Sequence, residues 1–148
     1  MKSTIKHSRL RGLVAPLALF CSLAIAAPAN ADVAIIVNAA NKQALDAAAV
    51  ARIFFVQLRE FPGKESADPV YQPSGSKVDT EFTDKMTSVM PPDIKKAWAR
   101  LQFTGGVSRP RTVGSDDEVI NFVAAHASAI GYVDASKIHG DVRVVMKF

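Results

Sequence analysis

The chain has 148 residues, of which 49% are hydrophobic and 22% are charged, so it is long enough to form one small domain with a buried core. Its 18 basic and 14 acidic residues give a formal net charge of +4, but four of the basic residues lie within the first 11 positions. Residues 32–148 hold 14 of each sign, so the basic excess that would favour a nucleic-acid partner is confined to the N-terminal end.

The first 31 residues have the three-part pattern of a cleavable export signal. A basic start is followed by an apolar run from Leu13 to Ala27 and by the small-residue sequence Ala29-Asn30-Ala31. The apolar run contains Pro16 and is shorter than the roughly 20 residues of a membrane-spanning helix. We therefore expect removal of residues 1–31, a single domain over 32–148, and a mature protein located in the periplasm.

Hydrophobic periodicity divides the rest of the chain into eight segments. Continuous apolar runs predict strands, and apolar residues three or four positions apart predict helices. In chain order we expect a strand at 33–37, a helix at about 45–58, a strand at 68–72, a helix from about 76 to 90, a helix at about 92–101, a helix beginning after Ser115, and strands at 130–133 and 142–146. Helices between strands predict one layered α/β structure.

Large apolar side chains mark the inner faces of two of these helices. We expect Phe82 and Met86 to face the core together with Val89, because they follow one another at intervals of four and three residues. In the next helix, Trp98 belongs to a stripe at the same spacing. This spacing favours packing in the core over stacking against a ligand.

The sequence Ser74-Gly75-Ser76-Lys77, at the expected start of the helix ending near position 90, is the strongest local candidate for a binding site. A helix start offers unpaired N–H groups and a partial positive charge, glycine permits close approach of the backbone, and two hydroxyls can donate to an oxyanion. The alternative is that Ser76 only caps the helix and Asp79 completes a capping box. The residues alone favour the cap, because capping boxes are much more common than anion sites.

A family resemblance adds to this pattern. The chain carries Ala129-Ile130-Gly131-Tyr132-Val133-Asp134 after a helical segment, Ile53-Phe54 before a Phe-Pro-Gly turn, and Trp98 before Phe103-Thr104-Gly105. In this order, these motifs resemble those of the phosphate-type periplasmic substrate-binding proteins of ABC transporters over nearly all of residues 32–148. The resemblance implies one three-layer lobe of a type II periplasmic binding protein, with a mixed sheet flanked by helices.

The resemblance also implies a ligand and a site. Relatives hold phosphate with a Ser-Gly-Thr motif at the corresponding helix start, which implies that Ser74, Gly75 and Ser76 bind the ligand. Relatives also have an arginine a few residues earlier, where this chain has Val70-Tyr71-Gln72. Arg109 and Arg111 could replace that arginine if their loop folds back over the helix start. The alternative is that both are solvated loop residues.

Residues typical of enzymes and metal sites are sparse. The single cysteine, Cys21, lies inside the predicted signal, so residues 32–148 contain no thiol. His126 and His139 have no partner at a metal-ligand spacing, and neither a Gly-x-Ser-x-Gly elbow nor a P-loop is present. The acidic run at 116–118 follows Ser115, at an expected helix start where carboxylates interact favourably with the helix dipole. This position favours a structural role for them over a role as paired catalytic acids. We expect no catalysis, no metal and no cofactor.

We therefore expect an exported binding protein, associated with phosphate ABC transport, that takes phosphate, sulfate or a similar small oxyanion. Its protein partners would be membrane components of an ABC transporter or a periplasmic sensor, and self-association of two lobes would enclose the ligand. The alternative is a periplasmic interaction module that keeps the lobe only as a scaffold, which the missing arginine would favour.

Overall fold

The computed structural model describes residues 32–106 and 108–148, and the predicted export signal lies outside them. The described residues form four strands, four α-helices and one short 3-10 helix. In chain order these are β1 (Val33–Asn38), α1 (Ala47–Phe55), β2 (Asp68–Val70), α2 (Lys77–Val89), α3 (Pro92–Phe103), α4 (Asp116–Ala125), β3 (Ala129–Asp134), η1 (Ala135–Lys137) and β4 (Val142–Lys147). The predicted order of strands and helices is confirmed.

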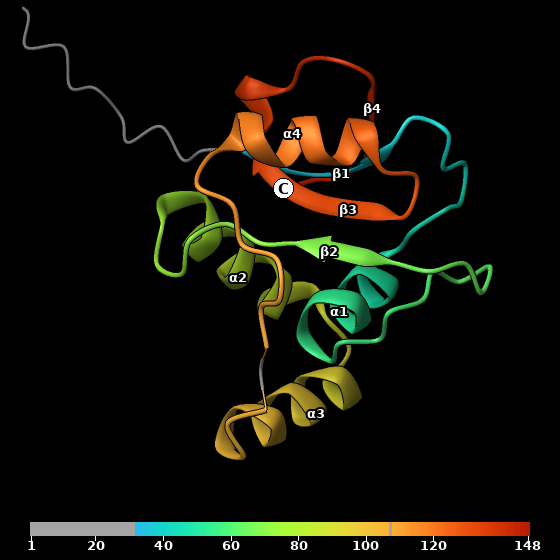
Figure 1. Cartoon of the computed structure of the whole chain (residues 1–148). Helices are drawn as coiled ribbons and strands as arrows, with labels where there is room; N and C mark the ends of the chain where they lie inside the picture. The colour runs from blue at the N-terminus through green and yellow to red at the C-terminus, as the bar shows by residue number, and fades with distance from the viewer. Residues whose placement is uncertain (1–31, 107) are drawn as a thin grey trace, which may run out of the picture.

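The strands form one mixed sheet in the order β2-β3-β1-β4 (Figure 1). Strand β1 pairs antiparallel with both β3 and β4, whereas β2 pairs parallel with β3. A continuous apolar sequence suits β1, because its first five residues are completely buried between two layers of side chains.

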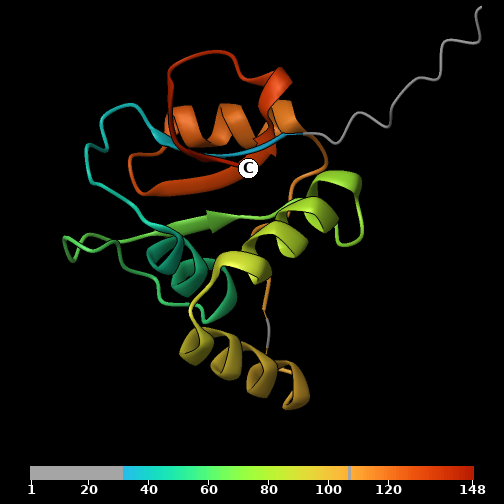
Figure 2. The ribbon, with the colours of Figure 1, turned by 180° about the vertical axis from the view of Figure 1, so that it is seen from behind.

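Helices cover both faces of this sheet and create two hydrophobic clusters. On one face, α1 and α2 pack against alternate residues of β1, and on the other face α4 packs against the remaining ones. Figures 1 and 2 show this arrangement from opposite sides, with α3 at the end of the molecule farthest from α4. The result is the three-layer α/β lobe that the sequence predicted.

Three helices begin at side-chain caps that are visible in the sequence. Asp46, Ser76 and Ser115 each accept a hydrogen bond from the backbone N–H three residues later. Helix α3 has no such cap and begins with Pro92, whose missing N–H costs nothing at this position. Among the described residues, none of the helices combines the length and the apolar character needed to cross a bilayer.

Some predicted boundaries and one core residue were wrong. Helix α1 spans 47–55 and not 45–58, because Asp46 caps its start and Gln57 adopts a positive φ of 59° just after its end. Strand β2 is shorter than predicted, and α3 continues to Phe103. Val89 is 47% exposed, because the buried stripe of α2 continues from Met86 to Met90, at a spacing of four residues.

Candidate functional site

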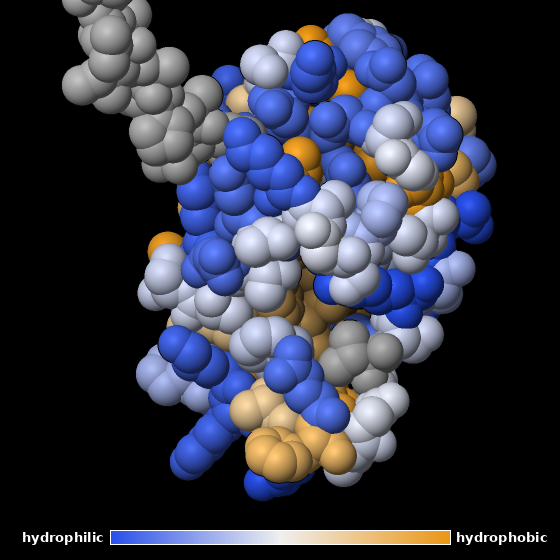
Figure 3. Space-filling model, turned by 90° about the vertical axis from the view of Figure 1, so that its left-hand side faces the viewer, coloured by the Kyte–Doolittle hydropathy of each residue, from blue (hydrophilic) through white to orange (hydrophobic). Residues whose placement is uncertain are grey.

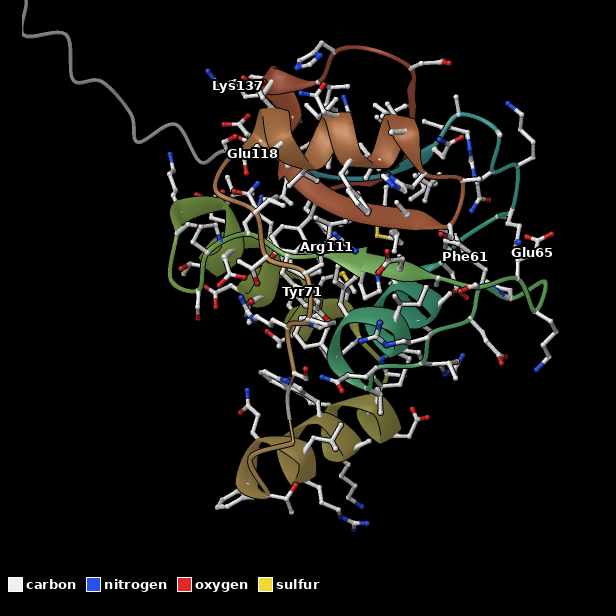
Figure 4. All side chains as sticks on the ribbon, viewed as in Figure 1. Phe61, Glu65, Tyr71, Arg111, Glu118 and Lys137 are labelled. Carbon is white, nitrogen blue, oxygen red and sulfur yellow. The ribbon has the colours of Figure 1, made fainter. Side chains whose placement is uncertain are left out.

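The loop before α4 is fixed against the end of β2 by backbone hydrogen bonds. The Tyr71 N–H donates to the Arg111 carbonyl at 2.8 Å, and the Val113 N–H donates to the Tyr71 carbonyl at 3.0 Å. The Gln57 side chain also donates to the Ser108 carbonyl at 2.8 Å. Figure 4 labels Tyr71 and Arg111 where this loop runs alongside the strand. Because the backbone is held in this way, the Arg109 side chain reaches the start of α2.

Asp79 lies at the centre of the polar contacts at this helix start. One carboxylate oxygen of Asp79 accepts from Arg109 at 2.8 Å and from the Tyr132 hydroxyl at 2.7 Å. The other oxygen accepts from the Gly75 N–H at 3.0 Å. The Asp79 residue is only 4% exposed, so its charge is balanced by the neighbouring guanidinium and not by water. The carboxylate thus supplies a negative charge at the helix start where the sequence predicts a bound oxyanion.

Gln72 and Tyr132 extend this network beneath the helix start. The Gln72 N–H donates to the Tyr132 hydroxyl at 3.0 Å, and its side-chain amide donates to Asp116 in the first turn of α4 at 2.6 Å. Burial, followed by the hydrogen bond to Asp79, raises the pKa of Tyr132 above its ordinary value. Tyr132 is therefore a neutral hydrogen-bond donor to Asp79 at physiological pH.

Tyr71 lies on the other side of Arg109 and is also held neutral. Its hydroxyl donates to the Phe54 carbonyl at 3.0 Å, and the Arg109 guanidinium lies 5.4 Å from the centre of its ring. Burial raises the pKa of Tyr71 to about 12, against the opposing charge of Arg109. Arg109 is thus held by a carboxylate and an aromatic face together.

The predicted Ser-Gly-Ser segment lies directly before this network. Ser74 and Gly75 are exposed, Gly75 has a φ of 79°, and a Cβ built on it would have no atom within 4 Å. Ser76 is half-buried, and its hydroxyl oxygen accepts from the Asp79 N–H at 3.2 Å, as in the capping interpretation. The helix start is therefore capped by the Ser76 side chain and is open to solvent at Gly75.

The two predicted arginines take different places. Arg109 reaches the helix start, as described above, with its side chain 29% exposed. Arg111 lies away from that start: its Nε is 3.6 Å from Asp68 and its guanidinium is 4.2 Å from the centre of the Phe122 ring. The geometry therefore brings Arg109, and not Arg111, together with Ser76 and Gly75.

A cavity of about 100 Å³ lies beside the Asp79–Arg109 pair. Six aromatic side chains line it: Phe54, Phe55, Tyr71, Phe82, Trp98 and Tyr132. The other lining residues are Asp79, Thr83, Gln102 and Arg109. Figure 3 shows a hollow floored by apolar atoms on the face above the end of the molecule that carries α3.

Two of the network residues carried only weak signals in the sequence. Gln72 stands at the end of a predicted strand, and Tyr132 carries a hydroxyl within an apolar strand. Each side chain therefore needs a buried hydrogen-bond partner, which the sequence did not identify. Asp79 was predicted only as part of a capping box. The contacts of Asp79 with Arg109 and Tyr132 join residues 30 and 53 positions apart.

Both histidines are exposed. His139 lies 3.0 Å from Asp117 in an exposed pair, and the His126 ring lies 2.8 Å from the Phe122 carbonyl in the preceding turn. Within residues 32–106 and 108–148, no three His, Cys, Asp or Glu side chains are grouped so that they could hold a metal ion.

The fold resembles part of two larger solved structures. One, from Clostridium perfringens, is described as a phosphate ABC transporter substrate-binding protein with bound phosphate, and the other is an ABC-type phosphate transport receptor from Vibrio cholerae. Each matches 78% of this chain with a TM-score of 0.58, at 15% and 18% identity respectively. The fold of this chain is thus similar to that of one lobe of these proteins.

This lobe spans less than half of each of those proteins, 45% of the first and 46% of the second. No family model and no curated protein matches the chain. The likeness therefore concerns the fold of the lobe, at low sequence identity.

Proposed function

We propose that the protein is an exported, non-catalytic solute-binding lobe that takes phosphate or a similar small oxyanion at the start of α2. The observation that carries the proposal is the arrival of Arg109 at this helix start from a distant loop, 2.8 Å from Asp79. The nearby hydroxyls of Ser74 and Ser76 and the open space beside Gly75 supply donors and access. The fold likeness to two phosphate-binding proteins supports this choice of ligand.

The geometry also predicts weak affinity. An entering anion has to share Arg109 with Asp79 and compete with Asp79 for the Gly75 N–H. If the lobe acts alone, one side of the ligand stays in water, whereas small-molecule sites usually bury most of their ligand. We expect a dissociation constant in the micromolar range or weaker, which corresponds to a binding free energy of about −8 kcal/mol or less favourable.

A second candidate is a periplasmic interaction module that keeps the lobe as a scaffold for a sensor or a membrane component of a transporter. Two observations favour it. Asp79 already satisfies Arg109 and the Gly75 N–H, so both donors have a partner without a ligand. Phe103, at the end of α3, is 94% exposed and is therefore accessible to a protein partner.

Calorimetric titration with phosphate and then sulfate at low ionic strength tests the two candidates. We expect saturable heat that disappears in the Ser74→Ala, Ser76→Ala double variant. Ser115→Ala is the matched control, because it also removes a helix cap, worth about 1 kcal/mol, but at α4. Absence of heat up to millimolar ligand would overturn the oxyanion proposal and leave the interaction module.

Asp79→Asn provides a second, opposite test of the same proposal. Removing the carboxylate charge leaves Arg109 without its anionic partner, so phosphate should bind the variant more tightly than the parent protein. Unchanged or weaker binding, in a variant whose circular dichroism matches that of the parent, would contradict the proposed role of Arg109.

The periplasmic location is tested by expressing the full chain in a Gram-negative host. We expect the protein in the periplasmic fraction, with an N-terminal sequence that begins at Asp32. Recovery of the uncleaved chain from the cytoplasm would contradict the predicted export.

A further inference from the structure

We propose that the ligand of this lobe is an organic oxyanion whose small apolar substituent fills the aromatic cavity between α1, α2 and α3. The inference rests on the proposed function, because the charged head of the ligand would lie at the oxyanion site. It goes further in assigning a second subsite and a chemical class, alkyl or aryl phosphates and phosphonates, in place of inorganic phosphate.

The first support is the construction of the cavity wall. Phe54 makes edge-to-face contacts with Tyr71, Phe82 and Tyr132, at centroid distances of 5.5, 5.1 and 5.5 Å. Trp98 meets Phe55 edge-to-face at 5.2 Å. Rings that hold one another in this way resist collapse into the space between them. The apolar wall of the cavity is therefore preformed, and its own side chains do not move in to close it.

The second support is the link between the cavity and the helix start. Asp79 and Arg109 line the cavity, and the same two side chains meet at the start of α2, where Asp79 accepts from the Gly75 N–H. A ligand whose charged head contacts Arg109 would thus have the aromatic space beside that head. Small-molecule sites commonly combine an apolar pocket with a few convergent polar groups in this manner.

The size of the cavity limits the substituent. Its volume of about 100 Å³ has room for a short substituent of about three carbon atoms. We therefore expect affinity to rise with chain length up to propyl and then to level off, because longer chains would extend into solvent.

A series of methyl-, propyl- and hexylphosphonate, with inorganic phosphate as the reference, tests this inference in the purified protein. Each buried methylene should improve binding about fourfold, so propylphosphonate should bind on the order of tenfold more tightly than methylphosphonate. Hexylphosphonate should bind about as well as propylphosphonate. Trp98 is the single tryptophan of the chain, so its fluorescence reports directly on occupancy of the cavity.

Two leucine variants of α2 separate the cavity from the rest of the helix. Thr83→Leu fills the cavity from its wall and should abolish the gain from methyl to propyl without changing the affinity for inorganic phosphate. Thr87→Leu makes the same substitution one turn later, outside the lining, and should leave the series unchanged. If Thr83→Leu fails to fold, Gln102→Phe fills the cavity from α3.

The outcomes separate the two proposals. Binding of phosphate with no dependence on chain length overturns the organic substituent but leaves the proposed function. A chain-length dependence that persists in both cavity-filling variants also overturns the inference, because the substituent then lies elsewhere. Failure of phosphate and of every phosphonate to bind overturns both proposals together.

Discussion

Asp79 is the residue on which the start of α2 depends. Its carboxylate receives one backbone N–H, one guanidinium and one phenol hydroxyl while it is almost completely buried. A buried carboxylate is stable only when such partners replace water. The same residue therefore caps a helix, fixes Arg109 and orients Tyr132.

Asp79→Ala should destabilise the protein strongly, because it leaves a largely buried arginine and a buried phenol without their acceptor. We expect a loss of about 3 kcal/mol in the free energy of unfolding, measured by urea denaturation. Asp84→Ala is the control on the exposed side of the same helix and should change stability by no more than about 0.5 kcal/mol. Equal effects of the two substitutions would contradict the central role of Asp79.

The two tyrosines of the chain predict a loss of stability at alkaline pH. Burial raises the pKa of Tyr71 from 10.0 to about 12, so the unfolded chain releases this proton before the folded chain does. The free energy of unfolding has its full value below pH 10 and falls as the pH rises toward 12, by about 1.4 kcal/mol per pH unit for each tyrosine that stays protonated in the fold.

Urea denaturation between pH 8 and 12 measures this fall, and Tyr71→Phe tests its origin. Tyr132, whose pKa is also raised by burial, remains in the variant, so about half of the tyrosine contribution should persist. An unchanged pH dependence in Tyr71→Phe would show that this residue does not contribute.

At the scale of elements, local sequence patterns predicted the type and order of every strand and α-helix among the described residues, but not the short helix η1. Ser76 and Ser115 marked helix starts correctly, because a cap involves residues only three positions apart. Boundaries were less predictable. The end of α1 depends on the backbone turn at Gln57, and the inner face of α2 depends on how the helix is rotated against the sheet, which exposes Val89.

Gly131 determines how closely α4 approaches the sheet. A Cβ at this position of β3 would lie 2.5 Å from Val119 Cγ1 in α4, which is far below van der Waals contact. Gly131→Ala should therefore cost about 1–3 kcal/mol in the free energy of unfolding, by forcing the helix outward. Gly106→Ala is the control, because a Cβ there meets its nearest atoms at 3.5 Å.

The second substitution Val119→Ala makes the steric cause testable. It removes the atom that the new methyl group would meet, so Gly131→Ala should cost less in the Val119→Ala background than alone. Equal costs in the two backgrounds would exclude the contact with α4 as the cause.

Helix α3 should open more easily than the rest of the lobe. It buries only Ile94, whereas α2, of similar length, buries four residues. Hydrogen exchange in low urea should give the amides of α3 a smaller opening free energy than those of α2 and β1. Equal protection of α3 and α2 would mean that contacts at the cavity hold α3 more firmly than its burial suggests.

At the scale of the whole molecule, the candidate site lies at the exposed residues Ser74 and Gly75 before α2. Solvent-exposed charge interactions are screened by salt, whereas enclosed ones are screened much less. Phosphate affinity measured by calorimetry should therefore fall several-fold between low salt and about 0.5 M NaCl. Insensitivity to salt would indicate that the ligand is enclosed, for example by a second copy of the chain.

The sequence by itself determined the elements, their order and the caps of α2 and α4, because each depends on residues within a few positions of one another. The tertiary structure decided that Arg109 and not Arg111 reaches α2, that Asp79 is its partner, and that six aromatic side chains line a cavity beside the pair. These contacts join residues up to 78 positions apart, as in the Phe54–Tyr132 ring contact. They exist only because the sheet and the backbone pairing of Tyr71 bring distant segments together, which no local pattern specifies.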